Sequence, residues 1–229
     1  LEEQKEKNFL FFQEIVELKM IHNDVVGIIL SGGKSRRMGS DKSFKKIKKI
    51  NMLELVIERA LKQVNSLAIN SNSKRNALSK KYNLEIIPDC IKGNLGPLAG
   101  ILTGLEWAKK NNGNCKWVIF FPVDSPFFPN DLVNKFMDNL IDEKIVMAKS
   151  NNRLHPVFSM WRIELSDNLK KSLGKGIRKI EDFTKKIQTR VVNFSFISYD
   201  PFFNVNSPDD LKRANEIFEL LNLEEGNLK

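Results

Sequence analysis

The chain has 229 residues, of which 41% are hydrophobic and 28% charged, and its formal net charge is +9. These proportions are typical of a globular protein and exclude a disordered or collagen-like chain, and the length suits one α/β domain with a single core. The longest apolar runs, such as WVIFF, are far shorter than the roughly 20 residues that cross a bilayer, so we expect a soluble protein without a membrane span. The two cysteines, Cys90 and Cys115, lack the spacing of a metal or redox motif, which favours a reducing, cytoplasmic setting.

The first 24 residues differ in pattern from the rest of the chain. They mix acidic residues and lysines before an apolar cluster, which is not the order found in a secretory signal peptide. One interpretation is a short amphipathic helix docked on the domain. We favour another, in which translation starts at Met20 and residues 1–24 are an extension or leader. We expect a single domain over residues 25–221 and a C-terminal tail over residues 222–229.

From residue 24 onward, short apolar runs alternate with helical patterns. The runs are mostly too continuous in hydrophobicity for strands with one wet face, so they predict buried strands. They are VVGIIL, SLAIN, LEIIP, WVIFFPVD, KIVMA, HPVFSM and TRVVNF. Helices are predicted over 51–64, over 96–110 with Pro97 in the first turn, and over 207–221, with Asn51 and Ser207 as N-caps of the first and last. This alternation predicts an α/β fold with a doubly wound, mainly parallel sheet and helices on both faces.

Ligands of such sheets bind in the crevice outside the carboxyl ends of the strands. Polar clusters follow three of the predicted strands, and a fourth precedes the last helix. They are SGGKSRRMGSDK after GIIL, PDCIKGNLGPLAG after LEII, VDSPFFP after WVIFF, and FFNVNSP. The functional site is therefore expected where these clusters meet.

The first cluster has the composition of a phosphate-binding loop. Gly32 and Gly33 let an anion approach the main-chain N–H groups, and Arg37 and Lys42 can add full positive charges. The spacing is neither that of a P-loop nor that of a dinucleotide fingerprint. Two glycines after a strand are weak evidence alone, since a tight turn with solvated lysines is the common alternative.

The string LSGGKSRRMGSDK resembles the signature L-[AS]-G-G-x-S-x-R-M-G-x-D-K of the molybdenum cofactor guanylyltransferase family. Matching segments follow in order from about residue 25 to residue 217: LAINSN, IIPD, GPLAG, FFPVDSPF, HPVFSM and FFNVNSPDDL. The resemblance implies a Rossmann-like, three-layer nucleotidyltransferase. It also implies transfer of GMP from GTP to the terminal phosphate of molybdopterin, with Mg²⁺ as cofactor and release of pyrophosphate.

The resemblance also implies roles for individual residues. The nucleotide is held by the loop after the first strand, by two polar residues that complete the nucleoside site, and by the metal-binding aspartate: Leu30, Ser31, Gly32, Gly33, Lys42, Asn70, Asp89 and Asp124. The implied catalytic residues are Arg37, Lys42 and Asp124, of which Asp124 binds the magnesium. The implied acceptor-side contacts are His155, Asn204 and Asn206.

Each of these residues also has a structural alternative. Asn70 and Asp89 are typical turn residues at strand ends, Asp124 fits a turn or helix cap, and His155 fits a structural strand end. Asn204 and Asn206 lie close enough to the last helix to bond its main chain, and GPLAG suits plain helix–sheet packing.

Two rival functions remain open at this stage. A sister enzyme of the same fold transfers a cytidylyl group to molybdopterin, or a nucleotidyl group to a sugar or cobinamide phosphate; Gly-Gly rather than Ala-Gly in the loop favours GTP over CTP by analogy alone. A basic nucleic-acid-binding protein would suit the net charge and the run KSFKKIKK, but this run lacks a series of stacking aromatics. We expect GTP and molybdopterin as partners, with cofactor-delivery or acceptor proteins as further candidates, and neither nucleic acid nor membrane.

Overall fold

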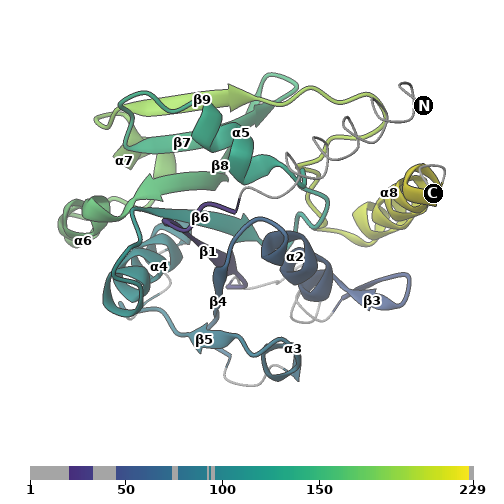
Figure 1. Ribbon diagram of the computed structural model, residues 1–229, viewed down its shortest axis with the longest axis horizontal. Coiled ribbons are helices and arrows are strands. Elements are labelled where there is room, and N and C mark those ends of the chain that lie inside the picture. Colours follow the sequence, from purple (N-terminus) through teal and green to yellow (C-terminus); the bar gives the residue numbers. More distant parts are fainter. Residues whose placement is uncertain (1–20, 33–44, 74–76, 92, 94–95, 227–229) are drawn as a thin grey trace, which may run out of the picture.

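A central sheet of seven strands organises the protein (Figure 1). The computed structural model describes residues 21–32, 45–73, 77–91, 93 and 96–226. The strand order is β5-β4-β1-β6-β8-β7-β9, and all pairs are parallel except those that β8 makes with β6 and β7. The strands are β1 (Val25–Leu30), β4 (Ser66–Asn70), β5 (Glu85–Ile87), β6 (Trp117–Pro122), β7 (Ile145–Ser150), β8 (Arg153–Arg162) and β9 (Thr189–Asn193). Each predicted strand is present, and the predicted mainly parallel α/β fold is confirmed.

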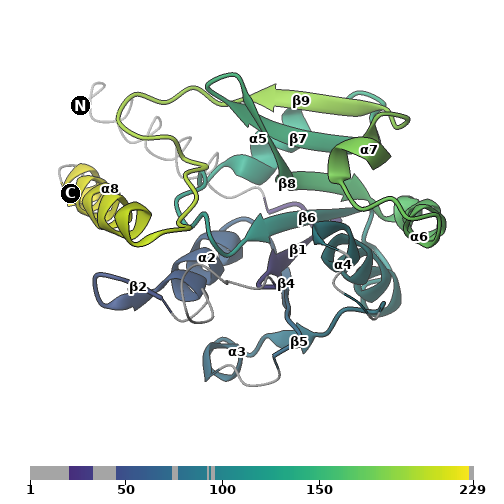
Figure 2. The same cartoon turned by 180° about the vertical axis from the view of Figure 1, so that it is seen from behind.

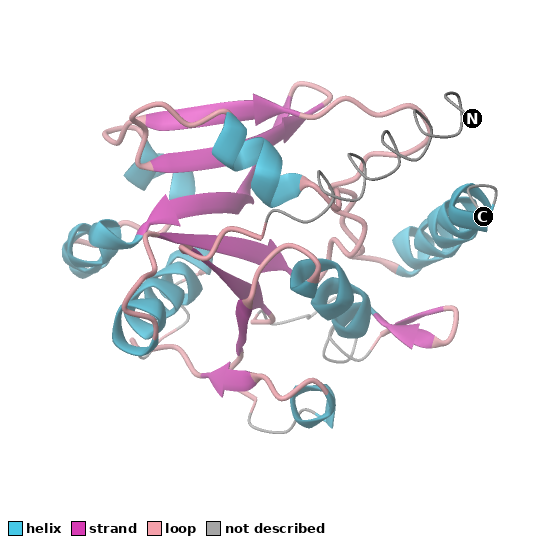
Figure 3. Cartoon of the chain, in the orientation of Figure 1, coloured by secondary structure: helices cyan, strands magenta, loops and turns pink. Residues whose placement is uncertain are grey.

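Helices cover both faces of this sheet, so the domain has three layers (Figure 3). Side chains alternate between the two faces along a strand. In β1, Ile29 packs in the cluster that includes α2 (Met52–Leu61) and α5 (Leu132–Asp138). Its neighbour Ile28 packs in the opposite cluster, and Figure 2 shows the helices of that face. They are α4 (Pro97–Asn111), α6 (Ser166–Gly174) and α7 (Ile180–Thr184).

The remaining elements lie around this core. The short α3 (Ala77–Lys81) precedes β5, and a 3-10 turn η2 (Ile163–Leu165) follows β8. The hairpin of β2 (Lys46–Ile47) and β3 (Ile50–Asn51) packs with α8 (Pro208–Gly226) around a third apolar cluster. Because α8 continues to Gly226, the first residues of the expected C-terminal tail are helical. None of the helices described here is long and apolar enough to span a membrane.

The two predicted N-caps differ in outcome. Ser207 caps α8 reciprocally with Asp210: the Asp210 N–H donates to Ser207 Oγ (3.1 Å), and the Ser207 N–H donates to Asp210 Oδ2 (2.8 Å). Asn51 precedes α2 as predicted, but its side chain makes no capping hydrogen bond. Asn51 is also the last residue of β3, where it pairs with Lys46.

Candidate functional site

The carboxyl ends of β1, β4 and β6 meet at the centre of the sheet. The Ser31 N–H donates to the Asn70 carbonyl (2.9 Å), and the Val123 N–H donates to the Leu30 carbonyl (3.1 Å). The chain passes from β1 to β4 on one side and returns to β6 on the other, so this edge is a topological switch point, where open α/β sheets bind ligands.

The loop after β1 begins at this switch point. Ser31 is buried, whereas Gly32 is exposed. Among the residues that the structure describes, no heavy atom would lie within 4 Å of a Cβ placed on Gly32. Gly33, Arg37 and Lys42 lie outside the described residues, so their predicted contacts with phosphate stay predictions.

Asn70 and Asp89 form a hydrogen-bonded pair beside this loop. The buried Asn70 side chain donates from Nδ2 to the Ile87 carbonyl (3.1 Å) and to Asp89 Oδ1 (3.0 Å). Asn72 binds the same carboxylate from the other side, because its Nδ2 donates to Asp89 Oδ2 (3.0 Å) and its Oδ1 accepts the Asp89 N–H (3.0 Å). Three hydrogen bonds thus hold Asp89, and its carboxylate oxygens can accept further hydrogen bonds. These contacts go beyond those of an ordinary turn residue, the alternative that the sequence left open.

The first turns of α4 press closely against this pair. A Cβ on Gly100 would lie 2.6 Å from Asn70 Oδ1 and 2.8 Å from Leu30 Cδ2. The helix begins at Pro97 after Gly96, whose φ of 72° favours glycine. The GPLAG segment therefore does both things that the sequence allowed: it starts a helix at the site and packs that helix tightly through a small residue.

Asp124 follows β6 on the other side of β1. It is half-buried, and its carbonyl accepts the Val205 N–H (2.8 Å). The hydroxyl of the next residue, Ser125, donates to Asn204 Oδ1. Two segments that are far apart in the sequence are thereby joined at the carboxyl edge, which brings the predicted metal residue next to the predicted acceptor residue Asn204.

The remaining acceptor-side candidates have well-defined surroundings. The Asn206 main-chain N–H donates to Asp210 Oδ2 (2.9 Å) at the start of α8, which leaves the proposed role of its side chain a prediction. His155 is only 8% exposed, its Nε2 lies 2.7 Å from Ser150 Oγ, and its ring stacks on Phe202 at 4.7 Å. Burial lowers the pKa of His155, an effect that the charge of Arg153 supports and that of Asp200 opposes.

Magnesium fits the donor set at this edge. In the described parts of the chain, no three His, Cys, Asp or Glu side chains are grouped to hold a metal ion together. Mg²⁺ is commonly bound by one or two carboxylates plus waters and substrate phosphates. The half-buried Asp124 at this edge offers one such carboxylate.

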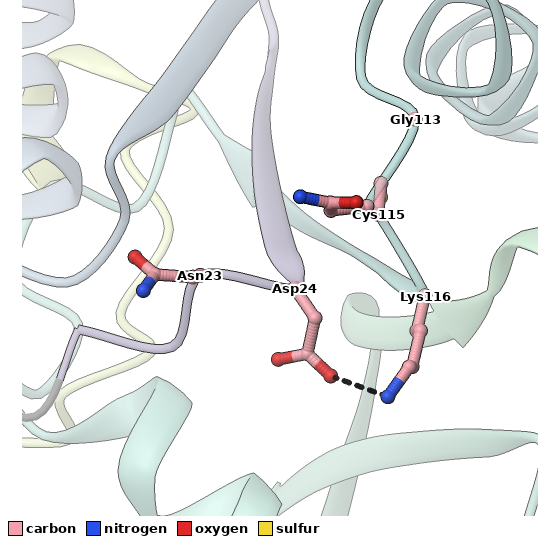
Figure 4. Close-up of a pocket in the computed structure, with 6 residues that line it drawn as sticks. Asn23, Asp24, Gly113, Cys115 and Lys116 are labelled. Carbon is pink, nitrogen blue, oxygen red and sulfur yellow. Dashed lines mark ion pairs between the residues drawn. The ribbon is translucent and has the colours of Figure 1, made fainter.

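A separate pocket lies at the opposite edge of the sheet (Figure 4). It is lined by the segments that precede β1 and β6, and Asp24 and Lys116 form an ion pair of 3.8 Å in it. Cys115 also lines this pocket, and burial raises the pKa of its thiol to about 11, which disfavours the thiolate form. Because the pocket lies at the amino ends of β1 and β6, it is remote from the predicted site residues at the carboxyl ends of these strands.

Several residues of the carboxyl edge escape prediction from sequence. Asn72 holds Asp89, Ser125 holds Asn204, and Ser150 lies between His155 and Asp200. Only Asn72 has a signal in the sequence: in the string NSN it follows Asn70 by two residues, so both lie on the same side of an extended chain. The contact of Ser125 with Asn204 spans 79 positions and that of Ser150 with Asp200 spans 50. Ser150 and His155 are five positions apart and are brought together by the pairing of β7 with β8.

A mainly parallel sheet with a glycine just after the strand at its switch point is typical of Rossmann-like proteins, which bind ligands at this edge. Comparisons with known proteins agree. The model of the MobA-like NTP transferase domain matches residues 27–190. Molybdenum cofactor guanylyltransferase from Mesorhizobium japonicum is 37% identical over 206 residues, which cover 87% of this chain and 98% of that protein. The enzyme of the same name from Rhodopseudomonas palustris strain BisB5 is 35% identical over 200 residues, covering 86% and 95%.

Solved structures show the same fold. Molybdopterin-guanine dinucleotide biosynthesis protein A from Archaeoglobus fulgidus superposes with a TM-score of 0.69 at 25% identity, covering 84% of this chain and 98% of that one. A 4-diphosphocytidyl-2C-methyl-D-erythritol synthase from Anaerococcus prevotii shares the fold alone, with a TM-score of 0.67 at 14% identity. The chain belongs to the MobA-like NTP transferase family, together with the molybdenum cofactor guanylyltransferases, and is a nucleotidyltransferase.

Proposed function

We propose that the protein transfers GMP from GTP to the terminal phosphate of molybdopterin, which forms the guanine dinucleotide cofactor and releases pyrophosphate. Family membership over nearly the whole domain supports this function. The observation that carries it is the arrangement at the switch point, where the fixed Asn70–Asp89 pair lies on one side of β1 and Asp124 on the other. This arrangement supports a nucleoside site at Asn70 and Asp89 and a metal site at Asp124, on either side of β1.

In the nucleoside half, the chain offers hydrogen-bond partners that are already oriented. The main chain of Leu30, Ser31 and Gly32 approaches the nucleotide, and the Asp89 carboxylate accepts N–H or O–H groups from it. Because Asn70 and Asn72 already orient this carboxylate, little rotamer entropy is lost on binding.

In the phosphate half, the main obstacle is repulsion between two anionic reactants. A phosphate of the acceptor attacks the α-phosphorus of GTP in line with the leaving pyrophosphate. A bound Mg²⁺ held by Asp124 supplies charge neutralisation of the phosphates. The positive charges of Arg37 and Lys42 stabilise the same phosphates and the leaving pyrophosphate. Gly33 belongs to the loop that binds these phosphates. A phosphate monoester is itself the nucleophile, so no serine or cysteine nucleophile is required.

On the acceptor side, we propose that molybdopterin approaches over Asn204, Asn206 and His155. We also propose that residues 25–221 act as one nucleotidyltransferase domain and that the protein works in the cytoplasm. Proteins that deliver molybdopterin or receive the product are the natural partners of such an enzyme.

An assay of nucleotide choice and metal use tests this function. Purified protein with Mg²⁺, GTP and molybdopterin should release pyrophosphate, and CTP should substitute poorly. Asp124→Asn should lower turnover by at least about 100-fold while circular dichroism and thermal unfolding stay close to those of the wild type. The matched control is Asp167→Asn on α6, which removes an exposed carboxylate that pairs with Lys109 of α4. This variant should retain full activity.

Two results would contradict the proposal. Turnover with CTP alone would assign the protein to a sister activity of the same fold. Full activity of the Asp124→Asn variant would exclude the metal role of that residue.

A further inference from the structure

Three polar side chains outside the nucleotide half form a hydrogen-bonded chain at the carboxyl edge. Ser150 ends β7, His155 lies near the start of β8, and Asp200 lies in the segment between β9 and α8. Ser150 Oγ is 2.7 Å from His155 Nε2 and 2.8 Å from Asp200 Oδ1. Ser150 is fully buried and His155 nearly so, so both depend on these contacts for their hydrogen bonds.

The direction of these hydrogen bonds follows from the inventory of donors. An ionised carboxylate only accepts, and a serine hydroxyl has one proton. Ser150 therefore donates to Asp200 and accepts the Nε2–H of His155. This network fixes one tautomer of His155, and burial lowers the pKa of the ring.

Asp200 also fixes the backbone of its own segment. Its Oδ1 accepts the Phe202 N–H (3.0 Å), and its carbonyl accepts the Phe203 N–H (3.0 Å). The Phe202 ring is 2% exposed and contacts the rings of His155, Phe158 and Phe194 at 4.7, 4.8 and 5.1 Å. Residues 200–203 are thus held to the sheet by polar and apolar contacts together.

The other end of this segment reaches the proposed metal residue. Asn204 accepts the hydroxyl of Ser125, and the Val205 N–H donates to the Asp124 carbonyl (2.8 Å). A shift of Asp200 would therefore be transmitted through a few residues of chain to Asn204 and to the main chain of Asp124. Asn70 and Asp89 have their own hydrogen bonds on β4 and on the loop after β5, across β1 from this segment.

We propose that Asp200, Ser150 and His155 are positioning residues for the acceptor half of the reaction, because they hold residues 200–205 so that Asn204 and Asp124 face the acceptor phosphate. This inference rests on the proposed guanylyl transfer. It predicts that loss of the network impairs use of molybdopterin and leaves GTP binding intact. A purely structural role would instead lower stability and both functions together.

Variants with a matched control separate these possibilities. Ser150→Ala and Asp200→Ala should each lower kcat/KM for molybdopterin by about 10- to 100-fold, the range expected for misplacement of reacting groups, while Kd for GTP changes less than about twofold. Asp200→Asn keeps an oxygen that accepts from Ser150 and Phe202, so it should retain most of the activity. The control is Ser159→Ala. Ser159 lies on β8 and is fully buried like Ser150, and its Oγ donates to the Pro156 carbonyl (2.8 Å) and accepts the Trp161 Nε1–H (2.7 Å).

The measurements are the thermal unfolding midpoint, the Kd for GTP by calorimetry, and initial rates at varied molybdopterin concentration. The inference is overturned if Ser150→Ala weakens GTP binding as much as it weakens use of the acceptor. It is equally overturned if Ser159→Ala produces the same acceptor defect, or if Asp200→Ala retains full activity. A wild-type protein that binds GTP but transfers nothing to molybdopterin would contradict the proposed function itself, and the inference would fail with it.

Discussion

Replacement of Gly100 by alanine should damage both stability and nucleotide binding, although alanine is the better helix former. The added Cβ would lie 2.6 Å from Asn70 Oδ1 and 2.8 Å from Leu30 Cδ2, closer than side-chain atoms pack. The Asn70 amide cannot turn away freely, because its Nδ2 is bound to the Ile87 carbonyl and to Asp89. Either α4 moves off the sheet or Asn70 loses a hydrogen bond.

The magnitude follows from three contributions. A methyl forced into a packed interior costs about 1–3 kcal/mol, and loss of one hydrogen bond of Asn70 adds about 1 kcal/mol. The gain in helix propensity from glycine to alanine offsets about 1 kcal/mol. The net expectation is that the free energy of unfolding falls by about 1–3 kcal/mol. If the displaced Asn70 also releases Asp89, Kd for GTP should rise about tenfold, equivalent to about 1.4 kcal/mol.

Two other helical glycines serve as controls in urea denaturation and GTP titration. A Cβ on Gly104 would meet Ile28 Cγ1 and Phe120 Cε1, each at 2.8 Å, so Gly104→Ala should lower stability but leave Kd for GTP unchanged. A Cβ on Gly174 of α6 would have no heavy atom of the described part of the chain within 4 Å, so Gly174→Ala should be neutral or stabilising by up to about 1 kcal/mol. The reasoning is refuted if Gly100→Ala is as stable as Gly174→Ala, or if Gly104→Ala weakens GTP binding equally.

Two further predictions concern single side chains of the site. Asn72→Ala removes both contacts that orient Asp89 from one side, so Kd for GTP should rise about 3- to 10-fold. The control Asn65→Ala breaks an exposed contact with Asn23 and should leave Kd for GTP unchanged. Equal Kd values for the two variants would argue against this role of Asn72. For His155, the folded-state pKa lies below its ordinary value of 6.5, so the unfolded chain binds the proton more readily and the free energy of unfolding should fall as pH drops from about 6.5. In urea denaturation, the free energy of unfolding of His155→Gln should fall less between pH 6.5 and 5 than that of the wild type. Equal pH dependence of the two proteins would contradict a lowered pKa of His155.

The predicted strands illustrate what local sequence can establish. Runs such as VVGIIL and WVIFFP are apolar at every position, and both strands are buried along their whole length at the centre of the sheet. Only strands covered on both faces need such composition. The long helices at 97–111 and 208–226 were likewise predicted from periodicity and from Pro97 and Ser207, whereas the short α3, α5, α6 and α7 were not, because five to nine residues carry little periodic signal.

The site shows the same division between local and distant information. Leu30 and Asn70 end a strand, and Asp89 and Asp124 lie two residues beyond one. Each also stands in a short motif, so the sequence could name them as candidates, and their roles stay predictions. The sequence could not decide whether Asp89 is an ordinary turn residue or a carboxylate held in one orientation. The answer depends on its hydrogen bonds with Asn70 and Asn72. His155 was identified as a candidate, but its partners Ser150 and Asp200 were not.

The amino-acid sequence by itself determined the α/β class, the mainly parallel sheet and the edge at which the site is predicted, because hydrophobic periodicity and turn chemistry act within about ten residues. Tertiary structure alone decided which polar groups meet there. The contact of Ser150 with Asp200 spans 50 positions and that of Ser125 with Asn204 spans 79. Such contacts depend on the strand order and on the reversed direction of β8, which no local pattern encodes.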